Sequence, residues 1–417
     1  MVLECKRCFY NLNHPLGLII DEEGICSGCR VHEEKDTLDW QQRFTKLKKI
    51  TNAYKSKKAK YDCIVPVSGG KDSYFIIDIV KNKLGMNPLL VSYNKMFNSI
   101  EGIENIANLR IKFDCDFIQK NINPSILKKI TRKTLYKYGN PYWHCISGET
   151  VFPVQMAVQL KIPLIIWGAH QGLEQVGMFS HQDEVEMTRR YRQDHDLFGV
   201  EVNDISDTYD DLDEHDLINF LYPPFTDIEN IGVRGIYLGN YIRWDSYAQH
   251  LKMVKKYGFK GRKLARTFDA YDYCDSLLYS DLHDLLKYFK HGYSKVTDHV
   301  CREIRFNRIS RNQGKKIIDF YSQQQPQNIH IFCKWLGVDE KALQLILNNH
   351  RNKLYWEEVS QNRWIKKEKI ITPTNRPKAL KYPNTANSKA SSENTYITVG
   401  KGVCWPKDVS KKLQKWL

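Results

Sequence analysis

One stretch near the start of the chain constrains its fold more than any other. Residues 62–73 read Asp-Cys-Ile-Val-Pro-Val-Ser-Gly-Gly-Lys-Asp-Ser. Residues 63–67 form a short, mostly apolar run of the kind that fits a parallel strand buried on both faces. Gly69 and Gly70 then allow a sharp turn and a close approach to a ligand, because neither carries a Cβ. Since an apolar run follows, we expect the stretch to fold as strand, turn and helix.

The turn, which we call the glycine loop (Ser68–Ser73), is a candidate anion site. A helix N-terminus leaves backbone N–H groups without helical partners, and here they would point into the turn. Two hydroxyls and one lysine stand beside them, on Ser68, Ser73 and Lys71. The sequence is not a Walker A loop, which places several residues between its first glycine and Gly-Lys. Ser-Gly-Gly-Lys-Asp-Ser instead resembles the pyrophosphate loop of the N-type ATP pyrophosphatases, which cleave ATP between its α and β phosphates.

Apolar strands alternate with helices after the glycine loop. We expect strands at 88–93, 116–118 and 162–167, and helices at 103–111 and 124–138. This alternation predicts an α/β fold with a doubly wound parallel sheet, whose ligands lie at the carboxyl ends of the strands. Polar clusters follow several of the expected strands. They supply two further candidates for nucleotide binding, Asn94 and Gly168.

Two CxxC pairs precede the sheet. Cys5 and Cys8 are separated from Cys26 and Cys29 by 17 residues. Two such pairs can place four thiolates around one tetrahedral ion, which is typical of zinc. A site with four sulfur ligands has no open position, so we expect Zn²⁺ there to stabilise the fold and not to catalyse a reaction.

The composition sets broader limits on function. The chain has 417 residues, a formal net charge of +15 and eleven cysteines. The charge favours an anionic partner, for which nucleotides, anionic sugars and nucleic acid would serve equally. No apolar run approaches the length of a membrane span, and the N-terminus does not resemble a signal peptide. We therefore expect no membrane span, a reducing compartment for the cysteines and a cytoplasmic location.

A polar and aromatic stretch at 140–149 reads Asn-Pro-Tyr-Trp-His-Cys-Ile-Ser-Gly-Glu. We expect it to form a loop at the wall of a pocket, just before a helix. Its candidate catalytic residues are His144, Cys145 and Glu149, alongside Lys71 and Asp72 of the glycine loop. A packed loop without chemistry is an equally open alternative, because adjacent side chains such as His144 and Cys145 usually point apart.

We predict five segments in the chain. They are a zinc-binding module at 1–35, a linking helix at 36–60, a nucleotide-binding domain at 61–232, a helical substrate or partner region at 233–350, and a linker and tail at 351–417. Within the nucleotide-binding domain, the charged and weakly periodic residues 180–225 could form an inserted lid.

Several motifs occur in one order along the chain. They are the paired CxxC motifs, the glycine loop, Tyr-Trp-His-Cys-Ile-Ser-Gly-Glu, Trp-Gly after the fourth expected strand, Tyr-Leu-Gly-Asn-Tyr-Ile-Arg-Trp-Asp at 237–245, and the run at 290–311. In this the chain resembles the N-acetyl sugar amidotransferases of bacterial surface-polysaccharide synthesis, the WbpG/PseA-like family. The resemblance covers roughly residues 1–345. One departure is the absence of an acidic residue directly after Trp167-Gly168, where the nearest carboxylate is Glu174.

The resemblance implies an ATP-dependent C–N ligase that forms AMP and pyrophosphate. Such enzymes convert the acetamido group of a nucleotide-linked N-acetyl sugar into an acetamidino group with ammonia, in O-antigen or related glycan synthesis. It implies an ATP site at Ser68, Gly69, Gly70, Asp72 and Ser73, and Lys71 and Mg²⁺ would offset the charge of the leaving pyrophosphate. Whether Asp72 holds the metal or caps the helix stays open.

The ammonia source is expected to be another protein. The sequence shows no second domain with the strand-turn-helix nucleophile of one common glutaminase class. We therefore expect a separate glutaminase subunit, and the resemblance suggests a cyclase-like channel subunit as well.

Two alternatives belong to other functional classes. One is a tRNA-thiolating enzyme, since some of these carry N-terminal zinc motifs and a charge of +15 suits RNA. Such enzymes typically need further paired cysteines, whereas Cys63, Cys115, Cys145, Cys274 and Cys301 are scattered, so nucleic acid is not the expected partner. The other is a non-catalytic zinc-ribbon adaptor, against which the intact glycine loop argues.

Overall fold

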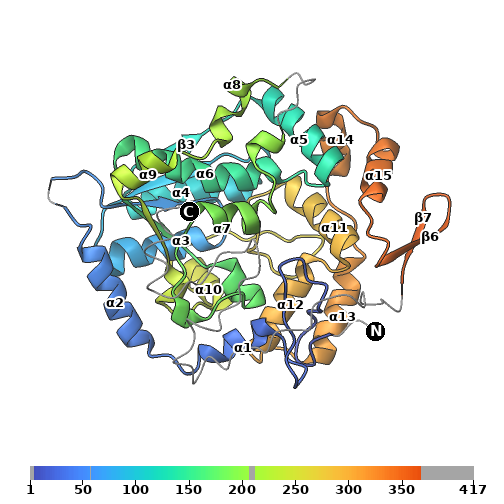
Figure 1. The fold of residues 1–417 in the computed structure, drawn as a ribbon, viewed down its shortest axis with the longest axis horizontal. Helices are drawn as coiled ribbons and strands as arrows, with labels where there is room; N and C mark the ends of the chain where they lie inside the picture. The colour runs from blue at the N-terminus through green and yellow to red at the C-terminus, as the bar shows by residue number, and fades with distance from the viewer. Residues whose placement is uncertain (1–3, 57, 206–211, 368–417) are drawn as a thin grey trace.

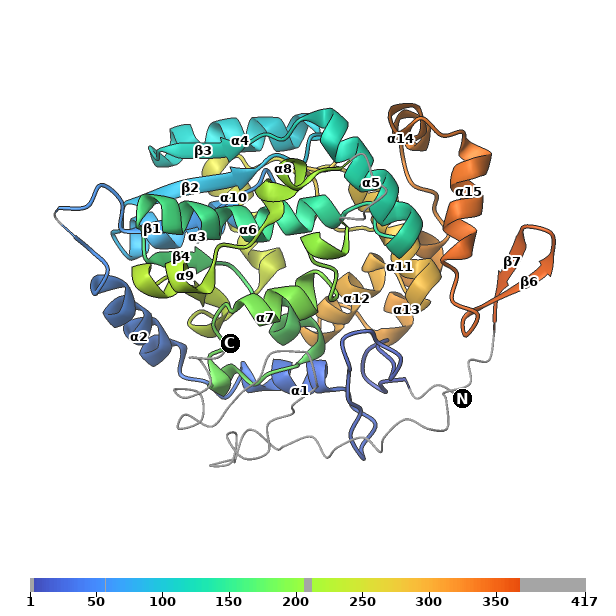
Figure 2. The ribbon, with the colours of Figure 1, turned by 45° about the horizontal axis from the view of Figure 1, so that its top comes forward.

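The computed structural model describes residues 4–56, 58–205 and 212–367. A five-stranded sheet with the order β3-β2-β1-β4-β5 lies at its centre, and all its pairings are parallel. The strands are β1 (Cys63–Pro66), β2 (Pro88–Tyr93), β3 (Phe117–Lys120), β4 (Leu164–Trp167) and β5 (Arg234–Tyr237). Helices cover both faces of this sheet (Figures 1 and 2). The predicted α/β class with a doubly wound parallel sheet is confirmed.

The strand residues alternate between two apolar layers. In β1, Cys63 and Val65 pack with α3 (Asp72–Ile77) and α10 (Ser246–Tyr257), whereas Ile64 packs with α6 (Trp143–Leu160) on the other face. β4 shows the same alternation. Because both of their faces are buried, β1, β2 and β4 are almost continuously hydrophobic, which is why the sequence pattern located them.

Several helices lie close to their predicted bounds. α5 (Pro124–Tyr138) matches its prediction, and α4 (Ile100–Phe113) extends the predicted 103–111 by a few residues at each end. In the predicted linking segment, α2 (Trp40–Asn52) forms the helix, and Asp39 accepts a hydrogen bond from the Gln42 N–H at its N-terminus. α3 continues into η1 (Asp78–Lys83), a stretch of π-helix.

The predicted loop at 140–149 is a correction. α6 begins at Trp143, so most of that stretch forms the first turns of a helix. Its aromatic and sulfur-containing side chains suggested a pocket wall, but Tyr142 and Cys145 are core residues packed against the C-terminal helices. A helix that is apolar on nearly every side lacks the periodic stripe by which sequence analysis finds helices.

Residues from 234 onward were expected to be helical, and this is also corrected. Arg234–Tyr237 forms β5, the fifth strand of the sheet, and the Arg234 N–H donates to the Pro163 carbonyl oxygen over 2.7 Å. The strand has four residues, too few for its pattern to be told from that of a helix. It is followed by η7 (Leu238–Asn240).

The described part of the segment predicted as an inserted lid, together with the residues on either side of it, consists of short helical pieces. These are η2 (Gly172–Val176), η3 (His181–Asp183), α7 (Arg189–Tyr191), η4 (Arg192–Asp196), η5 (Val202–Asp204), α8 (Glu214–Leu217), η6 (Ile218–Phe220) and α9 (Phe225–Ile231). Several pack on α6: the Trp143 Nε1–H donates to the Val200 carbonyl oxygen over 2.7 Å, and Phe220 lies against the same indole.

Five helices and a hairpin follow α10. They are α11 (Tyr279–His291), α12 (Lys295–Arg305), α13 (Arg311–Ser322), α14 (Ile329–Leu336), α15 (Glu340–Asn349), and the antiparallel pair β6 (Trp356–Ser360) and β7 (Arg363–Lys366). The hairpin corrects the predicted linker from 351, since Trp356 is buried against Phe289. The rest of the predicted linker and tail, from 368, lies outside the described residues.

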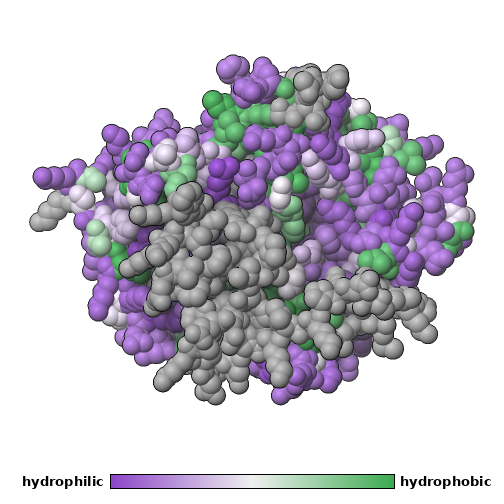
Figure 3. Space-filling model, viewed as in Figure 1, coloured by the Kyte–Doolittle hydropathy of each residue, from purple (hydrophilic) through white to green (hydrophobic). Residues whose placement is uncertain are grey.

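Where Figure 3 colours the surface by hydropathy, that surface is mostly hydrophilic, and hydrophobic residues gather in small separate patches. Within the described ranges, the helices are all too short or too polar to cross a membrane.

Candidate nucleotide and metal sites

The glycine loop joins the carboxyl end of β1 to α3. The Ser68 N–H donates a hydrogen bond to Ser73 Oγ over 2.9 Å, and the Gly70 N–H donates to Ser68 Oγ over 3.1 Å. The two hydroxyls therefore hold the turn itself. A Cβ on Gly69 would lie 2.3 Å from the carbonyl oxygen of Gly102 in α4. Glycine is needed at 69 because α4 lies against the loop, a reason that the sequence alone did not reveal.

The two charged residues of the loop are paired with residues from far along the chain. Lys71 Nζ lies 3.5 Å from Asp272 Oδ1, and Asp72 Oδ1 lies 3.3 Å from His250 Nε2. Burial acts to lower the pKa of Lys71, but Asp272 and Asp72 outweigh it and raise that pKa. Burial acts to raise the pKa of Asp72, but Lys71 and His250 outweigh it and lower that pKa. Both loop residues are therefore charged at neutral pH.

Asp272 is the centre of a larger network of charges. Its Oδ2 lies 2.8 Å from His299 Nε2 and 4.0 Å from Lys295 Nζ, both on α12. Burial acts to raise the pKa of Asp272, yet Lys71, Lys295 and His299 together hold it well below its usual range. The loop lysine and α12 thus share one buried carboxylate.

The sequence analysis missed these partners of the loop. His250 lies 178 positions beyond Asp72, and the other partners lie further along the chain. One signal was present: residues 269–275 read Asp-Ala-Tyr-Asp-Tyr-Cys-Asp, with a carboxylate at every third position. The first of these, Asp269, pairs with Arg302 Nη2 of α12 over 2.8 Å.

A second cluster of charges adjoins the loop. Lys95 Nζ lies 2.8 Å from Glu149 Oε1 and 3.0 Å from Asp275 Oδ2. Burial acts to lower the pKa of Lys95, but the two carboxylates outweigh this effect and raise that pKa. For Glu149, burial raises the pKa, and the nearby Lys95 only partly opposes this rise. A Cβ on Gly70 would lie 3.2 Å from Asp275 Oδ1, so this cluster borders the loop directly. The fold therefore places Glu149, a predicted catalytic residue, near the glycine loop. Lys95, which was not predicted as a site residue, lies there as well.

The other two predicted nucleotide-binding residues shape the backbone around the site. Asn94 Oδ1 accepts hydrogen bonds from the Met96 N–H over 2.9 Å and from Asn98 Nδ2 over 2.7 Å, so it holds the turn after β2. A Cβ on Gly168 would lie 2.9 Å from Ile76 Cδ1 of α3. Glycine therefore lets β4 end close to the helix that follows the loop.

Glu174, the nearest carboxylate after Trp167-Gly168, makes a contact away from the loop. Its Oε2 lies 2.6 Å from the buried Lys35 Nζ, which follows α1 (Ser27–Glu34) and also donates to the carbonyl oxygen of Trp244 over 2.9 Å. This carboxylate therefore fastens the N-terminal module to the segment after β4.

His144 and Cys145 are completely buried in α6. His144 Nδ1 lies 3.1 Å from the Tyr93 hydroxyl, and Cys145 Sγ lies 3.6 Å from His144 Nε2. Burial lowers the pKa of His144 to about 3 and raises the pKa of the Cys145 thiol. Both groups are therefore neutral, and the arrangement lacks the thiolate–imidazolium pair of an activated cysteine. Their role in catalysis stays a prediction.

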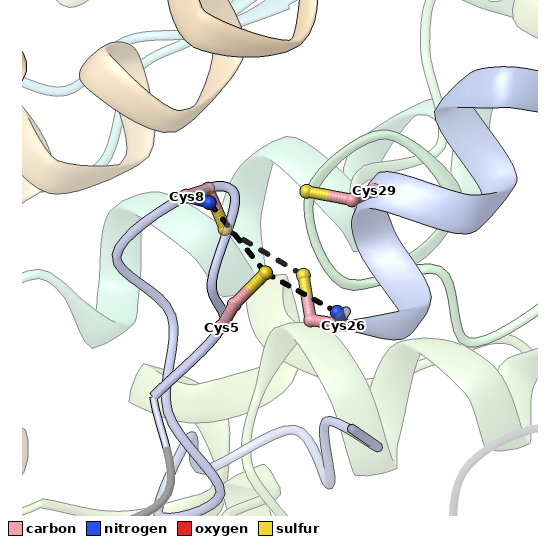
Figure 4. A group of neighbouring side chains, drawn as sticks. All are labelled: Cys5, Cys8, Cys26 and Cys29. Atoms are coloured by element: carbon pink, nitrogen blue, oxygen red, sulfur yellow. Dashed lines mark hydrogen bonds between the residues drawn. The ribbon is translucent and has the colours of Figure 1, made fainter. Parts of the chain in front are cut away.

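The four N-terminal cysteines form the cluster that their spacing predicts. Their sulfur atoms all lie within 4.8 Å of one another, and all four side chains are buried and point toward a common centre (Figure 4). The backbone N–H groups of Cys26 and Cys8 face Cys5 Sγ at 3.2 and 3.5 Å, and Cys29 lies in the first turn of α1. Four thiols in this arrangement can hold one metal ion.

The comparisons with known proteins found a family match in the C-terminal part of the chain. Residues 242–370 match the family model described as the C-terminal domain of LPS biosynthesis proteins like WbpG. We call these residues the WbpG-like region. The match contains the partners of the glycine loop from His250 to Arg302, and it extends past residue 345, where the resemblance was expected to end.

Two further similarities were found. An uncharacterized protein of Methanocaldococcus jannaschii is 34% identical over 123 residues, which are 28% of this chain and 43% of the relative. The chain thus spans less than half the length of that curated relative. Among solved structures, the U34-tRNA thiolase NcsA of Methanococcus maripaludis with its [4Fe-4S] cluster aligns over 82% of this chain and 98% of its own, at 11% identity and a TM-score of 0.24.

Within the WbpG-like region, α12 touches both sites. His299 and Arg302 face the carboxylates beside the glycine loop. Arg305 Nη2 lies 3.8 Å from Cys26 Sγ, and Cys301 Sγ lies 3.4 Å from the Phe9 N–H that would donate to it. One helix therefore spans the distance between the cysteine cluster and the loop.

Proposed function

We propose that this chain is an ATP-dependent amidotransferase that forms AMP and pyrophosphate. Its acceptor is a nucleotide-linked N-acetyl sugar, whose acetamido group becomes an acetamidino group. The observation that carries the proposal is the closure of the WbpG-like region over the glycine loop, with Asp272 paired to Lys71 and His250 to Asp72. That pairing joins an ATP-pyrophosphatase type of loop to a domain of LPS biosynthesis proteins.

ATP and Mg²⁺ fit the residues that are present. Lys71 stays protonated and can attract the phosphates, and the glycine loop has no side chain at two successive positions. Asp72 and Asp272 stay ionised, and carboxylates are the protein ligands that Mg²⁺ prefers. These two residues would hold the ion, which when bound would offset the negative charge of the phosphates.

The chemistry requires activation of a poor electrophile. The acetamido oxygen attacks the α-phosphorus of ATP, pyrophosphate leaves, and the product is an O-adenylated imidate. Ammonia then adds to the imidate carbon, AMP departs with the original oxygen, and the nitrogen loses a proton. Lys71 would meet the charge that develops on the pyrophosphate, and Glu149, with its raised pKa, would accept the proton.

The cysteine cluster is proposed to hold Zn²⁺ in a structural role. All four ligand positions would be sulfur, so no position is left for substrate. The cluster would instead fix the N-terminal module against α12, through Arg305 and Cys301.

The ammonia is proposed to come from a separate glutaminase subunit, delivered with the help of a cyclase-like channel subunit. Free ammonia is scarce at neutral pH because ammonium predominates. The buried and neutral His144–Cys145 pair is a poor glutaminase centre. We expect the purified chain to work with high ammonium and to use glutamine only when the partner is added.

The test incubates the purified chain with ATP, Mg²⁺, ammonium and a panel of nucleotide-linked N-acetyl sugars. Mass spectrometry should reveal a product in which an NH group replaces one oxygen, together with AMP and pyrophosphate. Ammonium is then replaced by glutamine, alone and with the candidate glutaminase. Release of ADP and phosphate would contradict the adenylation step, and robust turnover with glutamine alone would contradict the separate ammonia source. Sulfur transfer to tRNA, with no change in any sugar, would favour the thiolating alternative.

A further inference from the structure

A pocket lies inside the WbpG-like region, apart from the glycine loop. Its volume is about 320 Å³, within the range of small-molecule sites. Its walls come from the end of α10, the segment 259–271 and α13. None of its lining residues belongs to the strands or to the glycine loop, so this pocket is separate from the sheet edge at which ATP is proposed to bind.

Aromatic rings form much of the lining. Phe259 is buried, whereas Phe268, Tyr271 and Tyr321 are half-buried and leave part of their rings open. A nucleobase can stack on such a ring, because every base has a flat π-face. The lining therefore suits a flat aromatic group better than a purely aliphatic one.

The rim of the pocket is strongly basic. Residues 252–266 contain seven lysines and arginines and no acidic residue. Three of the seven are paired: Lys256 with Asp78, Lys260 with Glu104, and Arg266 with Asp284. For the other four, the described part of the chain offers no carboxylate partner; they are Lys252, Lys255, Arg262 and Lys263. The last two line the pocket, where they can attract phosphate groups.

Two chains of contacts connect the pocket to the glycine loop. The Tyr271 ring lies 5.6 Å from the His250 ring, and His250 is the partner of Asp72. Thr267 Oγ1 lies 2.6 Å from His299 Nδ1, and His299 is in turn the partner of Asp272. A ligand seated in the pocket is therefore close enough to extend toward the loop.

We propose that this pocket binds the nucleoside diphosphate of the acceptor, with its base on the aromatic rings and its phosphates toward Arg262 and Lys263. The inference rests on the proposed function, because it assumes an acceptor linked to a nucleotide. ATP lies at the carboxyl edge of the sheet, where ligands of doubly wound folds bind. The acceptor sugar then extends from the pocket toward the loop, where its acetamido group meets the α-phosphate.

The experiment measures binding directly and needs no turnover. UDP, GDP and ATP with Mg²⁺ are titrated separately into the full chain by calorimetry. Lys263→Glu reverses an exposed charge on the rim, and Lys252→Glu makes the same change on the same basic stretch outside the pocket. Tyr321→Ser removes one ring, and its melting temperature is recorded to show that it folds.

We expect Lys263→Glu and Tyr321→Ser each to weaken binding of the preferred nucleoside diphosphate about tenfold. Lys252→Glu should stay within about twofold of the parent, and ATP binding should be unaffected by all three. Absence of nucleoside diphosphate binding, or unchanged binding in both pocket variants, would overturn the inference. Parallel loss of ATP binding would show that the pocket holds ATP itself, and displacement by an RNA stem-loop alone would show that it holds nucleic acid. Binding as expected without sugar turnover would reject only the proposed function.

Discussion

The cysteine cluster and the carboxylates beside the glycine loop both contact α12, but the two sites are built in opposite ways. The four cysteines come from one short N-terminal stretch, and their sulfur atoms all lie within 4.8 Å of one another. The loop also comes from one short stretch, but its charges are neutralised by residues that lie 178 positions or more further along the chain. A permanent structural ion needs a closed local site, whereas a site that binds and releases its ligand needs charges that can change partners.

The same helix makes this contrast testable. Arg302 and Arg305 lie one turn apart on α12, and the first faces Asp269 while the second faces Cys26. A substitution at the glycine loop should lower catalytic activity and have little effect on the stability of the fold. A substitution at one of the four cysteines should lower the stability of the fold. Any loss of catalytic activity should then follow from that loss of stability.

The largest effect is expected for Asp72→Asn. It removes a carboxylate that would hold Mg²⁺ and leaves the shape of the side chain, so formation of AMP should fall by about 100-fold or more. The melting temperature should change by only a few degrees. Asp227→Asn, an exposed change in α9, is the matched control. Activity within a few-fold of the parent would remove Asp72 from the mechanism.

The next effect is on metal content and folding. Cys29→Ser should lose the bound zinc and lower the melting temperature by on the order of 10 °C, because structural zinc contributes directly to folding. Cys115→Ser, a half-buried cysteine outside the cluster, should leave both unchanged. Elemental analysis and thermal unfolding measure the two quantities. A metal-free protein of unchanged stability would reject the structural role of zinc.

A pair of variants on α12 separates the two sites. Arg302→Gln removes a charged hydrogen bond to Asp269 and should lower kcat/KM for ATP about tenfold. Arg305→Gln removes the guanidinium beside Cys26 and should mainly lower the melting temperature by a few degrees. If both variants showed the same profile, α12 would act as one structural unit and the contrast between the two sites would fail.

The smallest expected effect is on the stability of the protein at acidic pH. Burial lowers the pKa of His144 to about 3, below the value near 6.5 of an unfolded histidine. Between these values the unfolded chain binds the extra proton, so this stability is complete above about pH 6.5 and is lost as the pH falls toward 3. His144→Gln should therefore show a weaker loss of stability on acidification, whereas the exposed His215→Gln should match the parent. Equal acid sensitivity in all three proteins would mean that His144 is not held neutral.

The local parts of this molecule could be predicted from the sequence. β2 and α5 follow from a continuous apolar run and from an apolar periodicity bounded by turn residues. The cysteine cluster follows from spacing alone, because two CxxC pairs bring four thiols together whatever surrounds them. The glycine loop likewise follows from the strand and helix on either side. In each case the sequence pattern lies within the same few residues as the structural element that it predicts.

Other parts were decided only by tertiary packing. Trp143 to Glu149 looked like a loop but form a buried helix, because contacts with distant helices and not a periodic pattern stabilise it. Lys95 lies in a polar stretch that follows β2, but its pairing with Asp275, 180 positions away, could not be predicted from that stretch. Periodicity and turn chemistry act over a few residues and are written in the sequence. The pairing of a buried charge depends on which segments the fold brings together, and for this site only the packing of the WbpG-like region against the sheet determined that.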